Sequence, residues 1–243
     1  MRIPRLFVEQ SLASGDLVSL PKDKAHYVTH VLRMNTGAQL KLFNNTNSEF
    51  EGIIKSITKK SAEIEIKRVD VCHTESTLEI TLCLAVSRGQ HMDYSLQKAV
   101  ELGVHRIVPV LSEFSNVKIQ PDRLQNKMSH WQNILISAAE QCGRCCLPEL
   151  STPVLFQDCL LMDIPKPTLI FHPESNQSMQ KIDLMSKKLS LLIGPEGGFS
   201  KEEINIAQQN ETISVKLGPR ILRAETAVVT AISNAQQLWG DLK

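Results

Sequence analysis

The sequence lacks the features of a secreted or membrane-bound chain. No apolar run approaches the length of a membrane span, and no early stretch has the apolar core of a signal peptide. We therefore expect a cytoplasmic protein, in which the six cysteines stay reduced. Internal repeats and low-complexity segments are absent as well, so the sequence favours ordinary folded domains.

An excess of charge of one sign is also absent. The chain has 27 Lys and Arg against 26 Asp and Glu, and this net charge of +1 argues for no particular class of partner. The balance is uneven along the chain, because residues 1–72 carry 11 basic and 8 acidic side chains. The front segment is therefore the basic one, and 243 residues are enough for one large or two modest domains.

A metal-binding pattern is missing too. Cys142, Cys145 and Cys146 stand close together, but no second C-x-x-C pair and no histidine pair at ligand spacing lies nearby. A structural zinc ion needs four ligands. We therefore expect half-buried thiols at these positions, and no metal.

Glycine-rich turns give the stretch from Leu189 to Thr226 its character. Residues 190–193 form a short apolar run typical of a buried strand, and the run ends in Gly194-Pro195-Glu196-Gly197-Gly198. Glycine permits a sharp turn and lets a ligand approach the backbone closely. Ser200 and Glu203 then have the spacing of a capping box, which predicts a helix.

A second unit of the same kind follows directly. A strand expected at residues 213–217 ends in Gly218-Pro219-Arg220, and a helix is expected from Ala224. Neither loop has the G-x-G-x-x-G pattern of dinucleotide-binding proteins or the lysine of a P-loop. Two strand–loop–helix units place both loops at the carboxyl edge of one sheet, where α/β proteins bind ligands.

The chain divides at a polar, aperiodic linker expected over residues 69–75. Before it, short strands are expected at residues 5–8, 17–20, 39–43, 49–57 and 61–68, with a helix over residues 22–34, a pattern typical of a small barrel. After it, the pattern indicates an α/β domain. Strands are expected at residues 78–86, 107–110 and 169–171, and helices from His91, over residues 122–141 and over residues 224–239. The predicted domains are residues 1–72 and 73–243.

Several long motifs resemble the SPOUT class of RNA methyltransferases, and more narrowly the RsmE family. They are R-x-P-R-x-F at the start, S-R-G-x-x-M-D, A-A-E-Q-C-G-R, G-P-E-G-G-F-S-x-E-E-I and L-G-x-R-I-L-R-x-E-T-A, so the resemblance spans nearly the whole chain. It implies an N-terminal PUA-like domain with a small β-barrel. It also implies a C-terminal SPOUT α/β domain with a mostly parallel sheet and a deep trefoil knot.

The resemblance further implies a function. RsmE proteins transfer a methyl group from S-adenosylmethionine (SAM) to N3 of a uridine in 16S ribosomal RNA of the small subunit, and act as homodimers. Two alternatives stay open: SPOUT methylation of another rRNA or tRNA position, and an RNA-binding assembly factor without catalysis. The intact glycine loops argue against the assembly factor, because a pure binder need not keep them.

By position, the resemblance also assigns residues to the cofactor and to the chemistry. Arg220 and Arg223 are the electrostatic candidates, because a cation near the base would stabilise the anion left when uridine N3 loses its proton. His172 and Glu196 are the only nearby candidates to accept that proton. The cofactor residues are His172, Ile193, Gly194, Pro195, Glu196, Gly197, Gly198, Leu217, Gly218, Ile221, Leu222, Arg223 and Thr226.

RNA contacts are expected mainly from the basic front domain, because arginine offers a forked donor to phosphate. An exposed glutamine and arginine at the exit of the helix over residues 122–141 add to this set. The expected RNA-binding residues are Arg2, Arg5, Arg33, Arg88, Gln141 and Arg144.

Overall fold

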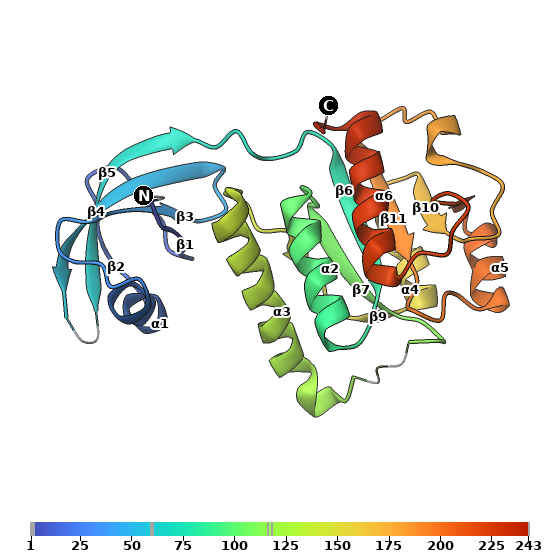
Figure 1. The fold of residues 1–243 in the computed structure, drawn as a ribbon, viewed down its shortest axis with the longest axis horizontal. Coiled ribbons are helices and arrows are strands. Elements are labelled where there is room, and N and C mark those ends of the chain that lie inside the picture. Colours follow the sequence, from blue (N-terminus) through green and yellow to red (C-terminus); the bar gives the residue numbers. More distant parts are fainter. Residues whose placement is uncertain (1–2, 59–60, 116, 118, 243) are drawn as a thin grey trace. The chain divides into compact units, whose positions relative to one another are not determined.

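The computed structural model describes residues 3–58, 61–115, 117 and 119–242 (Figure 1). The chain forms two compact units. The first joins residues 1–75 with residues 139–147, and the second joins residues 76–138 with residues 148–243.

A five-stranded sheet in the order β1-β3-β4-β5-β2 forms the first unit. Its β1 and β3 are parallel and its other pairs are antiparallel. One apolar core lies against this sheet, and the alternation of buried and exposed residues along β4 and β5 supplies much of it. The strands are β1 (Arg5–Phe7), β2 (Leu17–Ser19), β3 (Gln39–Phe43), β4 (Ser48–Ile57) and β5 (Ala62–Val71).

A helical segment closes this core with Ala25 and Val28, which are both buried. The sequence predicted one helix over residues 22–34, but the segment is an α-helix, α1 (Lys22–His26), that widens into a π-helical turn, η1 (Tyr27–Val31). The expected linker is also shorter than predicted, because β5 continues to Val71 and pairs there with Ser48.

The second unit contains a sheet in the order β12-β10-β11-β6-β7-β8, with β9 beside β7, and every pairing among its described residues is parallel. Its central strands β6 and β11 are buried almost throughout, which is why they read as continuous apolar runs. The strands are β6 (Glu79–Ala85), β7 (Arg106–Leu111), β8 (Glu149–Leu150), β9 (Val154–Leu155), β10 (Thr168–Phe171), β11 (Lys188–Ile193) and β12 (Ile213–Val215).

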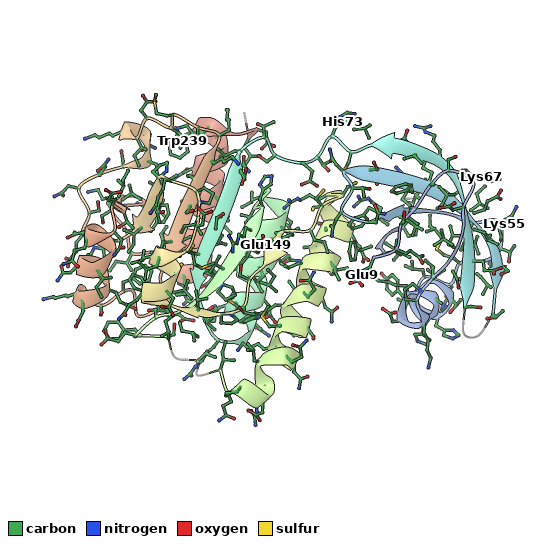
Figure 2. All side chains as sticks on the ribbon, turned by 180° about the vertical axis from the view of Figure 1, so that it is seen from behind. Glu9, Lys55, Lys67, His73, Glu149 and Trp239 are labelled. Carbon is green, nitrogen blue, oxygen red and sulfur yellow. The ribbon has the colours of Figure 1, made fainter. Side chains whose placement is uncertain are left out.

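Helices cover both faces of this sheet. On one face α2 and α6 pack side by side, and on the other α4 and α5 pack over the apolar side chains of β7, β10 and β11 (Figure 1). The sequence did not predict β8, β9, α4 or η2, which are all short. The helices are α2 (Gly89–Glu101), α3 (Pro121–Cys142), α4 (Phe156–Leu161), η2 (Met179–Lys181), α5 (Lys201–Gln209) and α6 (Ala224–Trp239). Figure 2 labels Trp239 at the end of α6, where its carbonyl accepts a hydrogen bond from Lys187 Nζ.

Candidate active site

Three neighbouring parallel strands, β12, β10 and β11, end at one edge of the second sheet. The loops after Phe171, Ile193 and Val215 therefore meet there, and the sequence predicted this edge for the two glycine loops. The backbone N–H of His172 donates to the carbonyl of Val215 at 2.9 Å, and so ties the first loop to the third.

A cavity of about 290 Å³ lies between these three loops and the first turn of α6. Its volume lies just below the range of about 300–1,000 Å³ usual for small-molecule sites. Most of its wall is apolar side chain and glycine backbone, with few charged groups. The lining residues are Phe171, His172, Pro173, Ile193, Gly194, Pro195, Glu196, Gly197, Gly198, Leu217, Gly218, Arg220, Ile221, Leu222, Ala224 and Ala227.

Glycine is required at two of these positions by the backbone. Gly198 has φ +71° and donates its N–H to the carbonyl of Pro195 at 2.9 Å, which closes a tight turn. Gly218 has φ +96° and no neighbouring atom would meet a Cβ there, so conformation alone selects glycine. Gly194 is different, because a Cβ there would come 3.2 Å from the ring of Phe199.

The predicted capping box is confirmed. Ser200 Oγ accepts the N–H of Glu203 at 3.2 Å, and Glu203 Oε2 accepts the N–H of Ser200 at 2.9 Å. Glu203 also accepts the backbone N–H of Glu113 at 2.9 Å, so one buried carboxylate joins the glycine loop to the turn after β7.

Arg220 and the start of α6 bring positive charge to the wall of the cavity. Arg220 lines it, and the N-terminus of α6 directs its partial positive charge toward it through Ala224 and Ala227. The carboxylate of Glu225 pairs with His91 Nδ1 at 3.2 Å. Among the described residues, neither Arg220 nor Arg223 forms an ion pair, so neither arginine is engaged by Glu196 or Glu225.

Eleven of the thirteen predicted cofactor residues line the cavity. Arg223 and Thr226 do not: Arg223 is the exposed N-cap residue of α6, and Thr226 is exposed one turn further on. The sequence reasoning missed Phe171, Pro173, Ala224 and Ala227. The spacing of the two alanines on one helical face was the available signal for them.

The sequence predicted that Arg5 would extend into solvent, but its side chain is buried. Its side chain is 7% exposed and donates to Glu49 Oε1 at 2.6 Å and to the carbonyls of Ala139, Gly143 and Arg144 at 2.7–3.0 Å. The guanidinium also lies 4.8 Å from the ring centroid of Phe43. Its donors are used inside the first unit, so the prediction of a phosphate contact is wrong for Arg5.

Arg144 is likewise buried, at 3% exposure, and pairs with Glu75 at 2.8 Å. The prediction of an exposed arginine at the α3 exit is therefore wrong, whereas Gln141 is exposed as expected. Arg33 and Arg88 are exposed and remain candidates for RNA contact. Arg2 lies outside the described residues.

Cys142, Cys145 and Cys146 flank Arg144 in the chain. Burial raises the pKa of the Cys145 and Cys146 thiols, so both thiols stay protonated near neutral pH. Within residues 3–58, 61–115, 117 and 119–242, no group of three or more His, Cys, Asp or Glu side chains could hold a metal ion. The same residues include no helix that is long and apolar enough to span a membrane.

Comparison with known proteins agrees with this geometry. A family model described as an RNA methyltransferase domain matches residues 74–236, and one described as an RNA methyltransferase PUA domain matches residues 20–67. A ribosomal RNA small subunit methyltransferase E from Buchnera aphidicola is 39% identical over 99% of this chain and 98% of its own length. The chain belongs to the ribosomal RNA small subunit methyltransferase E (RsmE) family.

Solved structures extend the comparison. A methyltransferase from Legionella pneumophila with bound SAM matches with a TM-score of 0.96 and 39% identity, over 100% of both chains. A family member from Neisseria gonorrhoeae, also bound to SAM, matches with a TM-score of 0.93 and 34% identity, again over 100% of both chains. The expected fold, a PUA domain followed by an α/β methyltransferase domain with a parallel sheet, is confirmed.

Proposed function

We propose that this chain methylates N3 of a uridine in 16S ribosomal RNA with SAM as the methyl donor. The observation that carries the proposal is the cavity between the three strand ends, where eleven residues expected to bind the cofactor meet. Proteins of the same fold and 34–39% identity hold SAM. The cytoplasm, where small ribosomal subunits are made, is our proposal for its location.

The residues of the cavity fit such a cofactor. Gly194, Gly197 and Gly218 leave backbone N–H and C=O groups open to an adenine edge without intervening side chains. Ile193, Leu217 and Leu222 form apolar walls, which exclude water from the bound group. When bound, SAM supplies a methyl group on a positively charged sulfur.

The protein then has to favour the anionic form of the uracil. Arg220 and the N-terminus of α6 place positive charge beside the cavity, and Arg223 occupies the N-cap position of that helix. This charge lowers the free energy of a uracil that has lost its N3 proton. His172 and Glu196, which both line the cavity, are our two candidates to accept the proton.

We further propose a division of labour between the two units and a homodimer. Residues 1–72 would bind RNA and residues 73–243 would hold the cofactor in a trefoil-knotted domain. Ile221 on the cavity loop is 86% exposed, an arrangement suited to cover by a second copy. Light scattering of the purified protein tests the dimer, because a monomer at micromolar concentration contradicts it.

The decisive experiment measures the product. Small subunits from a strain lacking the enzyme are incubated with the protein and SAM, and the digested RNA is analysed by mass spectrometry. N3-methyluridine is the expected product, and a methylated ribose or another methylated base would support another SPOUT activity. If calorimetry detects no SAM binding, the assembly-factor alternative is favoured.

A further inference from the structure

Phe114 is an exposed aromatic residue beside the cofactor cavity. Its side chain is 45% exposed, although phenylalanine is usually buried. A Cβ added at Gly197, which lines the cavity, would come within 3.0 Å of Phe114 Cβ and 3.7 Å of Phe114 Cγ. Phe114 therefore lies against the outer side of the glycine loop, at the rim of the cavity.

The turn that carries Phe114 is held in place. The N–H of Ser115 donates to the carbonyl of Ser112 at 3.0 Å, and the N–H of Ser112 donates to Ser115 Oγ at 3.3 Å. Glu203 accepts the N–H of Glu113 at 2.9 Å and also caps α5, which begins directly after the glycine loop. The backbone that carries Phe114 is thus held beside the glycine loop by a buried carboxylate.

The proposed reaction requires an exposed aromatic face that can hold an unpaired base. N3 lies on the pairing edge of uracil, so the target base must be unpaired and turned out of any helix before the methyl group can reach it. Unpaired bases in RNA–protein complexes are held by stacking on aromatic side chains. Phe199 is buried, and the aromatic rings of Phe171 and His172 line the space proposed for the cofactor itself. Phe114 lies outside that lining and is exposed, so its ring is available to a base.

We propose that Phe114 stacks on the target uracil and positions it at the mouth of the cavity. This role rests on the proposed function, since it assigns a substrate-positioning residue to the same site. Phe114 would contribute to RNA affinity and to the choice of an unpaired base. It would contribute nothing to cofactor affinity, because it does not line the cavity.

Three variants test the assignment. Phe114→Leu keeps apolar contact with Gly197 but removes the ring, and Phe114→Trp keeps an aromatic face. Tyr94→Leu is the matched control, because Tyr94 is 46% exposed, lies on α2 and does not line the cavity. Each protein is assayed with unmethylated small subunits for KM and kcat, and with SAM alone by calorimetry.

Phe114→Leu should raise the KM for the subunit on the order of tenfold, with unchanged SAM affinity, whereas Tyr94→Leu and Phe114→Trp should behave as the wild type. The tryptophan at position 114 in Phe114→Trp should also be quenched when unmethylated RNA is added, beyond any change from Trp131 and Trp239 in the wild type. An unchanged KM in Phe114→Leu, an equal effect in Tyr94→Leu, or a loss of SAM affinity equal to the loss of RNA affinity would overturn the proposal.

The experiments distinguish a failure of the proposed methyltransferase activity from a failure of the proposed stacking role of Phe114. If the wild-type protein transfers no methyl group, the proposed function fails, but quenching in Phe114→Trp still reports a base on the ring. If the wild type is active and Phe114→Trp is not quenched by the subunit, only the stacking role is wrong.

Discussion

Arg5 and Glu49 form an ion pair of 2.6 Å inside the first unit. The same guanidinium donates to four backbone carbonyls within residues 139–144, so it holds that segment against β1. An arginine that the sequence suggested for RNA is therefore a structural residue of this unit.

Arg5→Ala should lower the free energy of unfolding by about 3–5 kcal/mol, because it leaves several backbone carbonyls without their donor and removes one of the cations that pair with Glu49. Urea denaturation of the full chain measures this. The control is Arg68→Ala, since Arg68 is 65% exposed in its pair with Asp70 and its loss should change stability little. Equal, small effects in both variants would show that the Arg5 network contributes no net stability.

Glu49 should make stability depend on pH. Burial alone would raise the pKa of this carboxyl, but hydrogen bonds from Lys41 and Arg5 outweigh it and lower the pKa below its ordinary value. A lowered pKa stabilises the fold above the unfolded-state value of about 4.3, and this contribution is lost as pH falls through the folded value. Stability of the wild type should therefore decline more steeply below about pH 4.3 than that of Glu49→Gln. Parallel declines in thermal melts would contradict this.

The sequence predicted the cavity better than it predicted the RNA contacts. Glycine loops, a capping box and an apolar strand are local patterns, so α6 begins at Ala224 and Ser200 caps α5 as expected. Arg144 was misjudged because its partner, Glu75, is 69 residues away in the chain. No local pattern reveals that a loop cation is neutralised by such a distant carboxylate.

In the first unit, net charge counted from the sequence was likewise a poor guide to the cations available for RNA. Figure 2 labels Lys55 and Lys67 on β4 and β5, where each pairs with Glu65 at 2.7 Å. Lys24 pairs with Glu140 and Arg68 with Asp70 in the same unit. Much of the positive charge counted from the sequence is therefore balanced by nearby carboxylates.

Arg220→Ala should lower turnover on the order of a hundredfold with little change in RNA affinity, because its charge would stabilise the anionic uracil. Arg220→Lys should retain part of the rate, since it keeps the charge. Arg223→Ala should lose less than Arg220→Ala, because Arg223 does not line the cavity. Single-turnover rates and filter binding separate these effects. A loss of SAM affinity alone in Arg220→Ala would assign the arginine to the shape of the loop.

Arg33→Ala should weaken RNA binding and reduce the slope of log affinity against log salt by about one. Arg33 is exposed beyond the π-helical turn, with φ +51°, so its side chain can reach a phosphate. Arg68→Ala is the matched control, because that cation is already paired with Asp70. Filter binding over a salt series measures both, and an unchanged slope in Arg33→Ala would remove this contact.

Gly218→Val should abolish SAM binding, because a side chain there stands where the cofactor would approach the backbone. Part of the effect would be strain, since φ is +96° and such conformations cost about 1–3 kcal/mol for other residues. Gly15→Val is the control that separates the backbone strain of a valine at positive φ from obstruction of the cofactor by its side chain. Gly15 has φ +89° with open space around it, like Gly218, but belongs to the first unit.

Both variants should therefore lose similar stability in urea, while only Gly218→Val loses SAM affinity in calorimetry. Gly197→Val should also bind SAM poorly, but for another reason: its Cβ would come 3.0 Å from Phe114, so the glycine loop that lines the cavity would have to shift. If Gly218→Val binds SAM as tightly as Gly15→Val does, the loop after β12 is not part of the cofactor site. In that case the cavity would have to hold SAM through the loops after β10 and β11 alone.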